Sequence, residues 1–151
     1  LVEPENLHLT VKFLGNIDEG IVPAIEEVLS SLDIPPFEVV IGGVGAFPSI
    51  KRPSVIWLGL IEGGEEFSKL MINVDSLLSR LGFKREQRKP VPHLTLARVK
   101  WLTSPGPLMK LISSLEGVEV GRMVVDELRL KKSTLTPQGP IYETLASIKL
   151  G

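Results

Sequence analysis

The sequence contains no cysteine, which excludes disulfide bonds, thiolate catalysis, cysteine-bound zinc and iron–sulfur clusters. A reducing cytoplasm is therefore the default expectation for its location. Net charge is almost absent as well, because 17 basic residues face 18 acidic ones. The chain as a whole has no strong electrostatic attraction to nucleic acid or to acidic membranes, so any anion-binding site must be local.

Long hydrophobic runs are also missing. No apolar stretch approaches the roughly 18 residues of a membrane-spanning helix, and residues 1–6 lack the basic and apolar zones of a signal peptide. We therefore expect no membrane association. The apolar fraction of 43% is enough for a core, and the length predicts one domain over residues 1–151, which we expect to be a monomer.

Several catalytic patterns are absent too. The sequence has no G-x-S-x-G elbow, no G-x-x-x-x-G-K-[ST] phosphate loop and no G-x-G-x-x-G fingerprint. These absences argue against serine hydrolases of the elbow type and against the common nucleotide-binding loops.

Strands and helices are mixed along the chain without a βαβ rhythm. Alternation of apolar and polar residues predicts strands at 7–14, 37–41, 54–60, 93–99, 118–130 and 141–150. Helical spacing predicts helices at 18–32, 65–81 and 107–115. We expect bulges or loops in the glycine-rich stretch 42–48 and a turn at 136–140. The mixture predicts an α+β fold with antiparallel sheets.

The only two histidines of the chain lie in near-identical tetrapeptides, His8-Leu-Thr10-Val and His93-Leu-Thr95-Leu. In a strand, residues two apart point to the same face, so each motif presents an imidazole beside a hydroxyl. Two similar strands in one domain suggest two related lobes that each contribute half of a central site. A histidine in a strand is usually an ordinary half-buried residue, but the matched pair favours function.

A pair of imidazoles near neutral pH can hold one neutral base and one protonated acid, the combination that phosphodiester hydrolysis uses. The two threonines offer hydroxyl donors to phosphate oxygens, and Lys12 shares the face of His8 by parity and adds positive charge. Two histidines without cysteines, and without carboxylates at ligand spacing, make an incomplete metal set. We therefore expect neither a metal nor a cofactor.

With these motifs, the sequence resembles the two-histidine phosphoesterase superfamily, in particular the bacterial and archaeal RNA 2′,3′-cyclic phosphodiesterases, also called 2′-5′ RNA ligases. The similarity extends beyond the tetrapeptides and covers essentially the whole chain. The stretches that carry it are 4–15, 45–48, 132–137 and 139–142.

The resemblance implies a bilobal α+β fold, with two antiparallel sheets flanked by helices around a central cleft and a pseudo-twofold axis. It implies opening of an RNA terminal 2′,3′-cyclic phosphate to a 2′-phosphate, with no metal and with RNA 3′ ends or nucleoside 2′,3′-cyclic phosphates as partners. In the family, the residue matching His8 donates a proton to the leaving oxygen and the residue matching His93 activates water. Family members begin with a strand and a helix that this sequence lacks, so we expect either an open sheet edge or a preceding segment that this sequence does not include.

Further residues are candidates for substrate binding through the same resemblance. Arg98 matches a position that approaches the phosphate, but strict alternation turns it away from His93, so this role requires a bulge or strand end near Ala97. Phe47 and Tyr142 are candidates to bind the terminal nucleotide, with packing as the alternative. The basic stretch 84–89 could guide an RNA backbone or simply be a solvated loop.

Two other functions stay open at this point. The first is a nucleotide-binding or RNA-binding protein that keeps the cleft without turnover. The second is that the biological role is transfer RNA processing, by ligation of transfer RNA halves. This reversible joining of RNA ends through 2′-5′ linkages would use the same groups in reverse.

Overall fold

The computed structural model describes residues 8–99, 104 and 106–151. Its helices are η2 (Glu19–Ile21), α1 (Val22–Leu29), α2 (Gly64–Ser79) and α3 (Gly106–Ser114). Its strands are β1 (Phe37–Pro48), β2 (Pro53–Glu62), β3 (Leu94–Arg98), β4 (Glu119–Val125), β5 (Glu127–Thr136) and β6 (Gly139–Lys149). The predicted α+β class with antiparallel sheets is confirmed.

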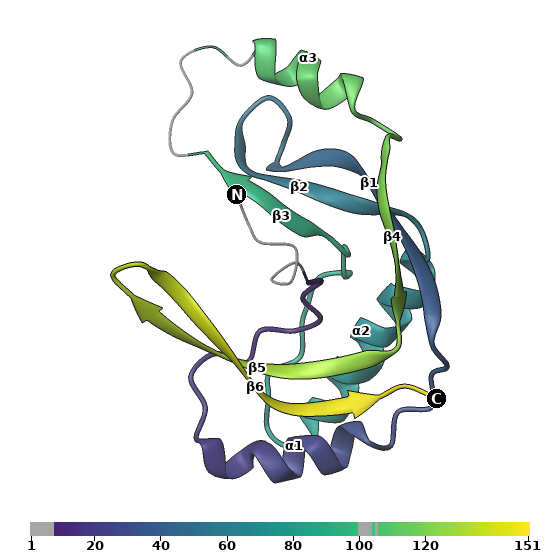
Figure 1. Ribbon diagram of the computed structural model, residues 1–151, viewed down its shortest axis with the longest axis vertical. Helices are drawn as coiled ribbons and strands as arrows, with labels where there is room; N and C mark the ends of the chain where they lie inside the picture. Colours follow the sequence, from purple (N-terminus) through teal and green to yellow (C-terminus); the bar gives the residue numbers. More distant parts are fainter. Residues whose placement is uncertain (1–7, 100–103, 105) are drawn as a thin grey trace.

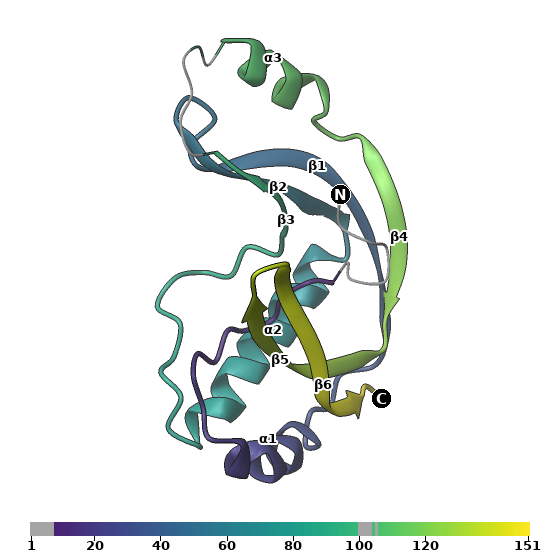
Figure 2. The same cartoon turned by 60° about the vertical axis from the view of Figure 1, so that its left-hand side comes forward.

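The strands form two separate sheets (Figure 1). The larger sheet has the order β3-β2-β1-β4, and the smaller one is the hairpin β5-β6. The pairing of β1 with β2 shifts register between Gly42 and Val44 and again between Phe47 and Pro48, so the irregularities expected in the glycine-rich stretch are present. They do not end the strand, which curves below α3 in the view of Figure 2 and continues to Pro48.

The prediction of one strand over 118–130 was wrong. The segment divides at Asp126 into β4 and β5, which belong to different sheets. Val125 pairs with Phe37 of β1, whereas Glu127 pairs with Lys149 of β6. The chain changes its hydrogen-bonding partner at this point, and alternation in sequence cannot show such a change because it reports only which face a side chain takes.

The strand predicted at 7–14 is not formed over residues 8–14. This segment lies between β3 and the β5-β6 hairpin in both views (Figures 1 and 2). Leu9, Val11 and Leu14 pack against the core, but the side chain of Phe13 is 84% exposed. A strand needs hydrogen bonds to a neighbouring backbone, and alternation alone does not provide one. The first motif therefore rests on apolar packing instead of sheet pairing.

The main core lies between helices α1 and α2 and the smaller sheet. The predicted stripe of α2 is confirmed, since Phe67, Leu70, Val74 and Leu78 are all nearly inaccessible to solvent. Burial of each such side chain stabilises the fold by roughly 1.5–3 kcal/mol. The other buried members are Ile25, Leu29, Val39, Val125, Leu128, Ile148 and Leu150. This packing fixes α2, which also carries Asp75 at the centre of the polar cluster described below.

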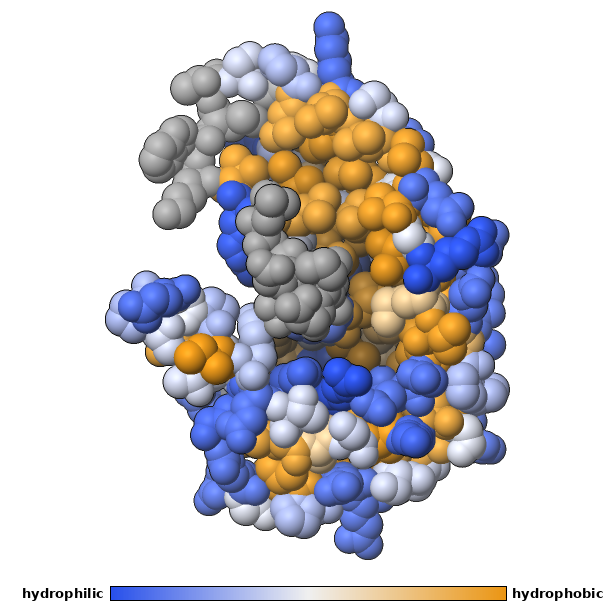
Figure 3. Space-filling view, in the orientation of Figure 1, coloured by the Kyte–Doolittle hydropathy of each residue, from blue (hydrophilic) through white to orange (hydrophobic). Residues whose placement is uncertain are grey.

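The upper part of the molecule differs in character. Apolar side chains gather over the larger sheet in Figure 3, whereas hydrophilic ones predominate over the lower part and the hairpin tip. No helix in the described residues is long and apolar enough to cross a membrane.

Candidate active site

His93 immediately precedes β3, and a backbone contact orients its ring. Nδ1 lies 2.7 Å from the carbonyl oxygen of Val91. Because a carbonyl oxygen can only accept, Nδ1 must carry the hydrogen of this bond. In the neutral imidazole the proton is then absent from Nε2, which is left with a lone pair. His93 is thus held in the tautomer that can accept a proton at Nε2.

Two aromatic rings form a wall beside His93. Phe47 of β1 meets the imidazole edge-on with ring centroids 5.2 Å apart, and the centroid of Trp57 in β2 lies 6.1 Å away. The two aromatic rings are 5.0 Å apart. Phe47 was predicted as a nucleotide contact, and the structure places it against the imidazole of the second motif.

Trp57 was not among the predicted site residues. Its ring lies over Gly45, where an added Cβ would fall 2.4 Å from the indole. Gly45 is directly opposite Trp57 in the β1-β2 pairing. A glycine facing a tryptophan on the neighbouring strand was the signal that could have found it, but residue 45 was predicted to lie in a stretch of bulges or loops, and the register was needed to see the pair. The indole Nε1 is buried and has no hydrogen-bond partner within the described residues.

The bulge that a phosphate role for Arg98 requires is present in β3. Thr95 pairs with Trp57 and Ala97 pairs with Ile56, so Leu96 is an extra residue in the ladder. Arg98 then pairs with Val55, which shares a strand face with Trp57. The backbone register therefore puts Thr95 and Arg98 on one face.

The first motif forms a second group with the hairpin. The rings of His8 and Tyr142 meet edge-on with centroids 5.8 Å apart. Tyr142 belongs to β6 and is half exposed. Thr10 is half-buried, whereas Thr95 of the second motif is exposed. The predicted residues Tyr142 and His8, distant in sequence, are thus brought into contact.

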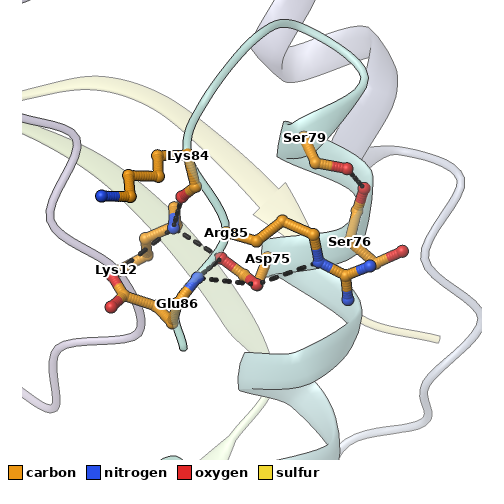
Figure 4. Close-up of polar contacts among 7 residues, drawn as sticks. All are labelled: Lys12, Asp75, Ser76, Ser79, Lys84, Arg85 and Glu86. Atoms are coloured by element: carbon orange, nitrogen blue, oxygen red, sulfur yellow. Dashed lines mark hydrogen bonds and ion pairs between the residues drawn. The ribbon is translucent and has the colours of Figure 1, made fainter. Parts of the chain in front are cut away.

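Lys12 lies in an ion-pair cluster on α2 (Figure 4). Its ammonium is 2.5 Å from Oδ1 of Asp75, donates to the carbonyl oxygen of Lys84 at 3.0 Å, and lies 3.5 Å from Glu86. Parity had placed Lys12 beside the phosphate with His8, but residues 8–14 form no strand and the parity argument loses its basis. Its role at the phosphate stays a prediction.

Asp75 is the centre of that cluster. It also accepts from the backbone N–H of Glu86 and pairs with Arg85. Burial raises the pKa of Asp75, but the Lys12 ammonium and the Glu86 N–H lower it by more, so the net pKa lies below its ordinary value. The carboxylate is ionised at neutral pH and ties the loop before His93 to α2.

No group of three or more histidine, aspartate or glutamate side chains that could hold a metal ion exists in the described ranges.

The model of the 2′-5′ RNA ligase superfamily matches residues 1–135. The chain belongs to this superfamily. The resemblance drawn from the motifs is therefore confirmed, and the two histidine motifs lie inside the matched range.

Curated relatives agree with this assignment. The RNA 2′,3′-cyclic phosphodiesterase of Methanothermobacter thermautotrophicus is 45% identical over 99% of this chain and 81% of its own length. The protein of the same name from Aeropyrum pernix is 40% identical over 98% of this chain and 84% of its own length. These relatives extend beyond the aligned region.

Solved structures show the same fold. E. coli LigT complexed with 3′-AMP superposes with a TM-score of 0.76 at 25% identity, covering 99% of this chain and 79% of LigT. A crystal structure of a Thermus thermophilus protein gives a TM-score of 0.73 at 28% identity, covering 99% of this chain and 80% of that protein.

Proposed function

We propose that this protein hydrolyses RNA terminal 2′,3′-cyclic phosphates to 2′-phosphates by acid/base catalysis. The observation that supports this proposal most directly is the hydrogen bond from His93 Nδ1 to the Val91 carbonyl oxygen. In the neutral ring this hydrogen bond leaves Nε2 as the base. Relatives named RNA 2′,3′-cyclic phosphodiesterase support the substrate class.

The reaction follows from these groups. Nε2 of His93 removes a proton from water as the water oxygen attacks phosphorus. The bond from phosphorus to the 3′-oxygen breaks, and protonated His8 delivers a proton to that oxygen. The products are a 2′-phosphate and a free 3′-hydroxyl. Thr10, Thr95 and Arg98 donate hydrogen bonds to the nonbridging oxygens, where negative charge develops.

The experiment is hydrolysis of a nucleoside 2′,3′-cyclic phosphate in EDTA between pH 5 and 9, with the product isomer identified. We expect a bell-shaped profile and a 2′-phosphate. His8→Ala and His93→Ala should each lower kcat by about 10²–10⁴-fold. Circular dichroism of both variants controls for folding.

Binding of the nucleotide without any turnover by the wild type would overturn the proposal in favour of a binding protein. Activity that disappears in EDTA and returns with a divalent cation would overturn the metal-free chemistry. The same samples, incubated with RNA carrying a 5′-hydroxyl, reveal whether joined 2′-5′ products form in reverse.

We also propose that the protein acts as a cytoplasmic monomer. Its lack of cysteine suits a reducing compartment. Light scattering in solution tests the monomer, and a dimer mass would overturn it.

A further inference from the structure

A groove of about 420 Å³ lies beside the Asp75 cluster, outside the groups that surround the two histidines. One wall comes from the segment after His8 and the other from the loop before His93. Its lining residues are Lys12, Phe13, Leu14, Phe83, Lys84, Arg85, Glu86, Gln87 and Arg88. The groove is thus built from the continuations of the two motifs.

The walls are held in place by a single buried carboxylate. Asp75 binds Lys12 of the first wall, and it binds the Glu86 N–H and Arg85 of the second. Lys12 also donates to the Lys84 carbonyl oxygen, which joins the walls directly. The groove is therefore preformed, and a ligand would not have to order these segments.

Positive charge remains available after these pairs are made. Lys12 and Arg85 are engaged by Asp75 and Glu86. Lys84 and Arg88 are exposed, and neither has an ion-pair partner in the part of the chain that the structure describes. Figure 4 shows the Lys84 ammonium extending away from the cluster. The groove can therefore attract an anion locally although the chain is nearly neutral.

An aromatic ring accompanies this charge. Phe13 is 84% exposed, an unusual state for a residue of this size, and it lines the same groove as Phe83. Exposed aromatic rings beside lysine and arginine are the combination that binds unpaired nucleotides, because bases stack on the ring while cations track the phosphates. An acidic peptide would use the cations but would leave Phe13 unexplained.

The groove is close to both histidines along the chain. Lys12 follows His8 by four residues and Arg88 precedes His93 by five. Even in a fully extended segment, the Cα atoms of His8 and Lys12 would be no more than about 14 Å apart, and those of Arg88 and His93 no more than about 18 Å apart. An RNA strand whose terminal phosphate lies at the two histidines can therefore reach the groove with the nucleotides that precede its end.

We propose that this groove binds the single-stranded body of the RNA substrate, with Lys84 and Arg88 on backbone phosphates and Phe13 stacked on an unpaired base. This inference rests on the proposed function. It makes an RNA terminus a better substrate than a lone cyclic nucleotide, and it gives the exposed Phe13 a role.

The test compares kcat/KM for a nucleoside 2′,3′-cyclic phosphate with kcat/KM for a single-stranded oligoribonucleotide that ends in the same group. The variants are Phe13→Ala and the pair Lys84→Ala with Arg88→Ala. The control pair Lys69→Ala with Lys110→Ala removes the same charge from helix surfaces outside the groove. We expect the oligonucleotide-to-mononucleotide ratio to fall about tenfold or more in the groove variants and to stay constant in the control.

Salt dependence gives an independent readout. The plot of log affinity against log salt for the oligoribonucleotide should flatten by about 1.4 in the charge variant, since each lost phosphate contact on a single strand contributes about 0.7. Fluorescence anisotropy of a labelled oligoribonucleotide measures this binding without any turnover. A groove that binds RNA in a protein that does not hydrolyse it would therefore refute only the proposed function.

Three results would overturn the groove assignment itself. They are an unchanged ratio in the groove variants, an equal loss in the control pair, and tighter binding of a blunt RNA duplex than of the single strand.

Discussion

The ammonium of Lys12 and the carboxylate of Asp75 form a buried ion pair, with Nζ and Oδ1 2.5 Å apart and side chains only 5% and 11% exposed. This pair joins the segment that follows His8 to the helix that precedes the His93 loop. It therefore links the segment that follows the first motif to α2, and Asp75 also binds the loop that precedes the second motif.

Breaking this pair should destabilise the protein. Lys12→Met leaves a buried carboxylate with weaker partners, and removal of one member of a buried pair typically costs about 3–5 kcal/mol. Urea unfolding followed by circular dichroism measures the loss. The control Arg122→Gln disrupts an exposed pair with Glu38 and Glu119, and should have a much smaller effect. If the variant kept its stability but lost much of its kcat/KM, Lys12 would instead act on the substrate phosphate, as the sequence analysis predicted.

The lowered pKa of Asp75 predicts a pH dependence of stability. A carboxyl whose folded pKa lies below its unfolded value near 3.8 stabilises the fold fully above that value, and this contribution is lost as the pH falls through the folded pKa. The urea midpoint of the wild type should fall steeply below about pH 4. Asp75→Asn should be less stable at neutral pH and should lose less on acidification. Parallel curves for the two proteins would contradict this account.

The sequence predicted best those features that depend on one segment alone. The stripe from Phe67 to Leu78 follows helical spacing, and helical spacing needs no partner. For Arg98 to share the face of His93, a bulge or a strand end near Ala97 was required, and the structure contains a bulge at Leu96.

Features that depend on a partner were not predictable. Alternation over 118–130 continues through Asp126 although the chain changes sheets there. The contact of Trp57 with His93 depends on which residue of β1 faces the indole, and only the register with Gly45 supplies it. The partners of Lys12, Asp75 and the Lys84 carbonyl oxygen, are distant from it in sequence. The alternation of residues within its own segment could therefore not predict where its ammonium lies.

A methyl group at Gly45 should displace the ring that lies beside His93. The added Cβ would fall 2.4 Å from the rigid indole of Trp57, so the ring must move. We expect Gly45→Ala to lower kcat for a cyclic nucleotide about tenfold or more, because small misplacements of catalytic groups are costly. Gly121→Ala is the matched control, since an added Cβ on that strand meets no atom within 4 Å. Equal kcat values in both variants would show that Trp57 does not position His93.

Removal of the Arg98 guanidinium should destabilise the transition state more than the bound ground state. The bulge at Leu96 puts Arg98 on the face of Thr95, and Arg98 is exposed with no ion-pair partner among the described residues. Loss of one preorganised donor to a developing charge commonly costs about 10²–10³ in kcat. Arg98→Ala should show such a loss and bind the 2′-phosphate product less tightly, as a raised inhibition constant would reveal. Arg98→Lys should recover only part of the rate, because an ammonium cannot donate two parallel bonds.

The control Arg80→Ala removes an exposed charge at the end of α2 and should leave both constants unchanged. An Arg98→Ala protein with wild-type kcat and product affinity would mean that the cation stabilising the phosphate has still to be found.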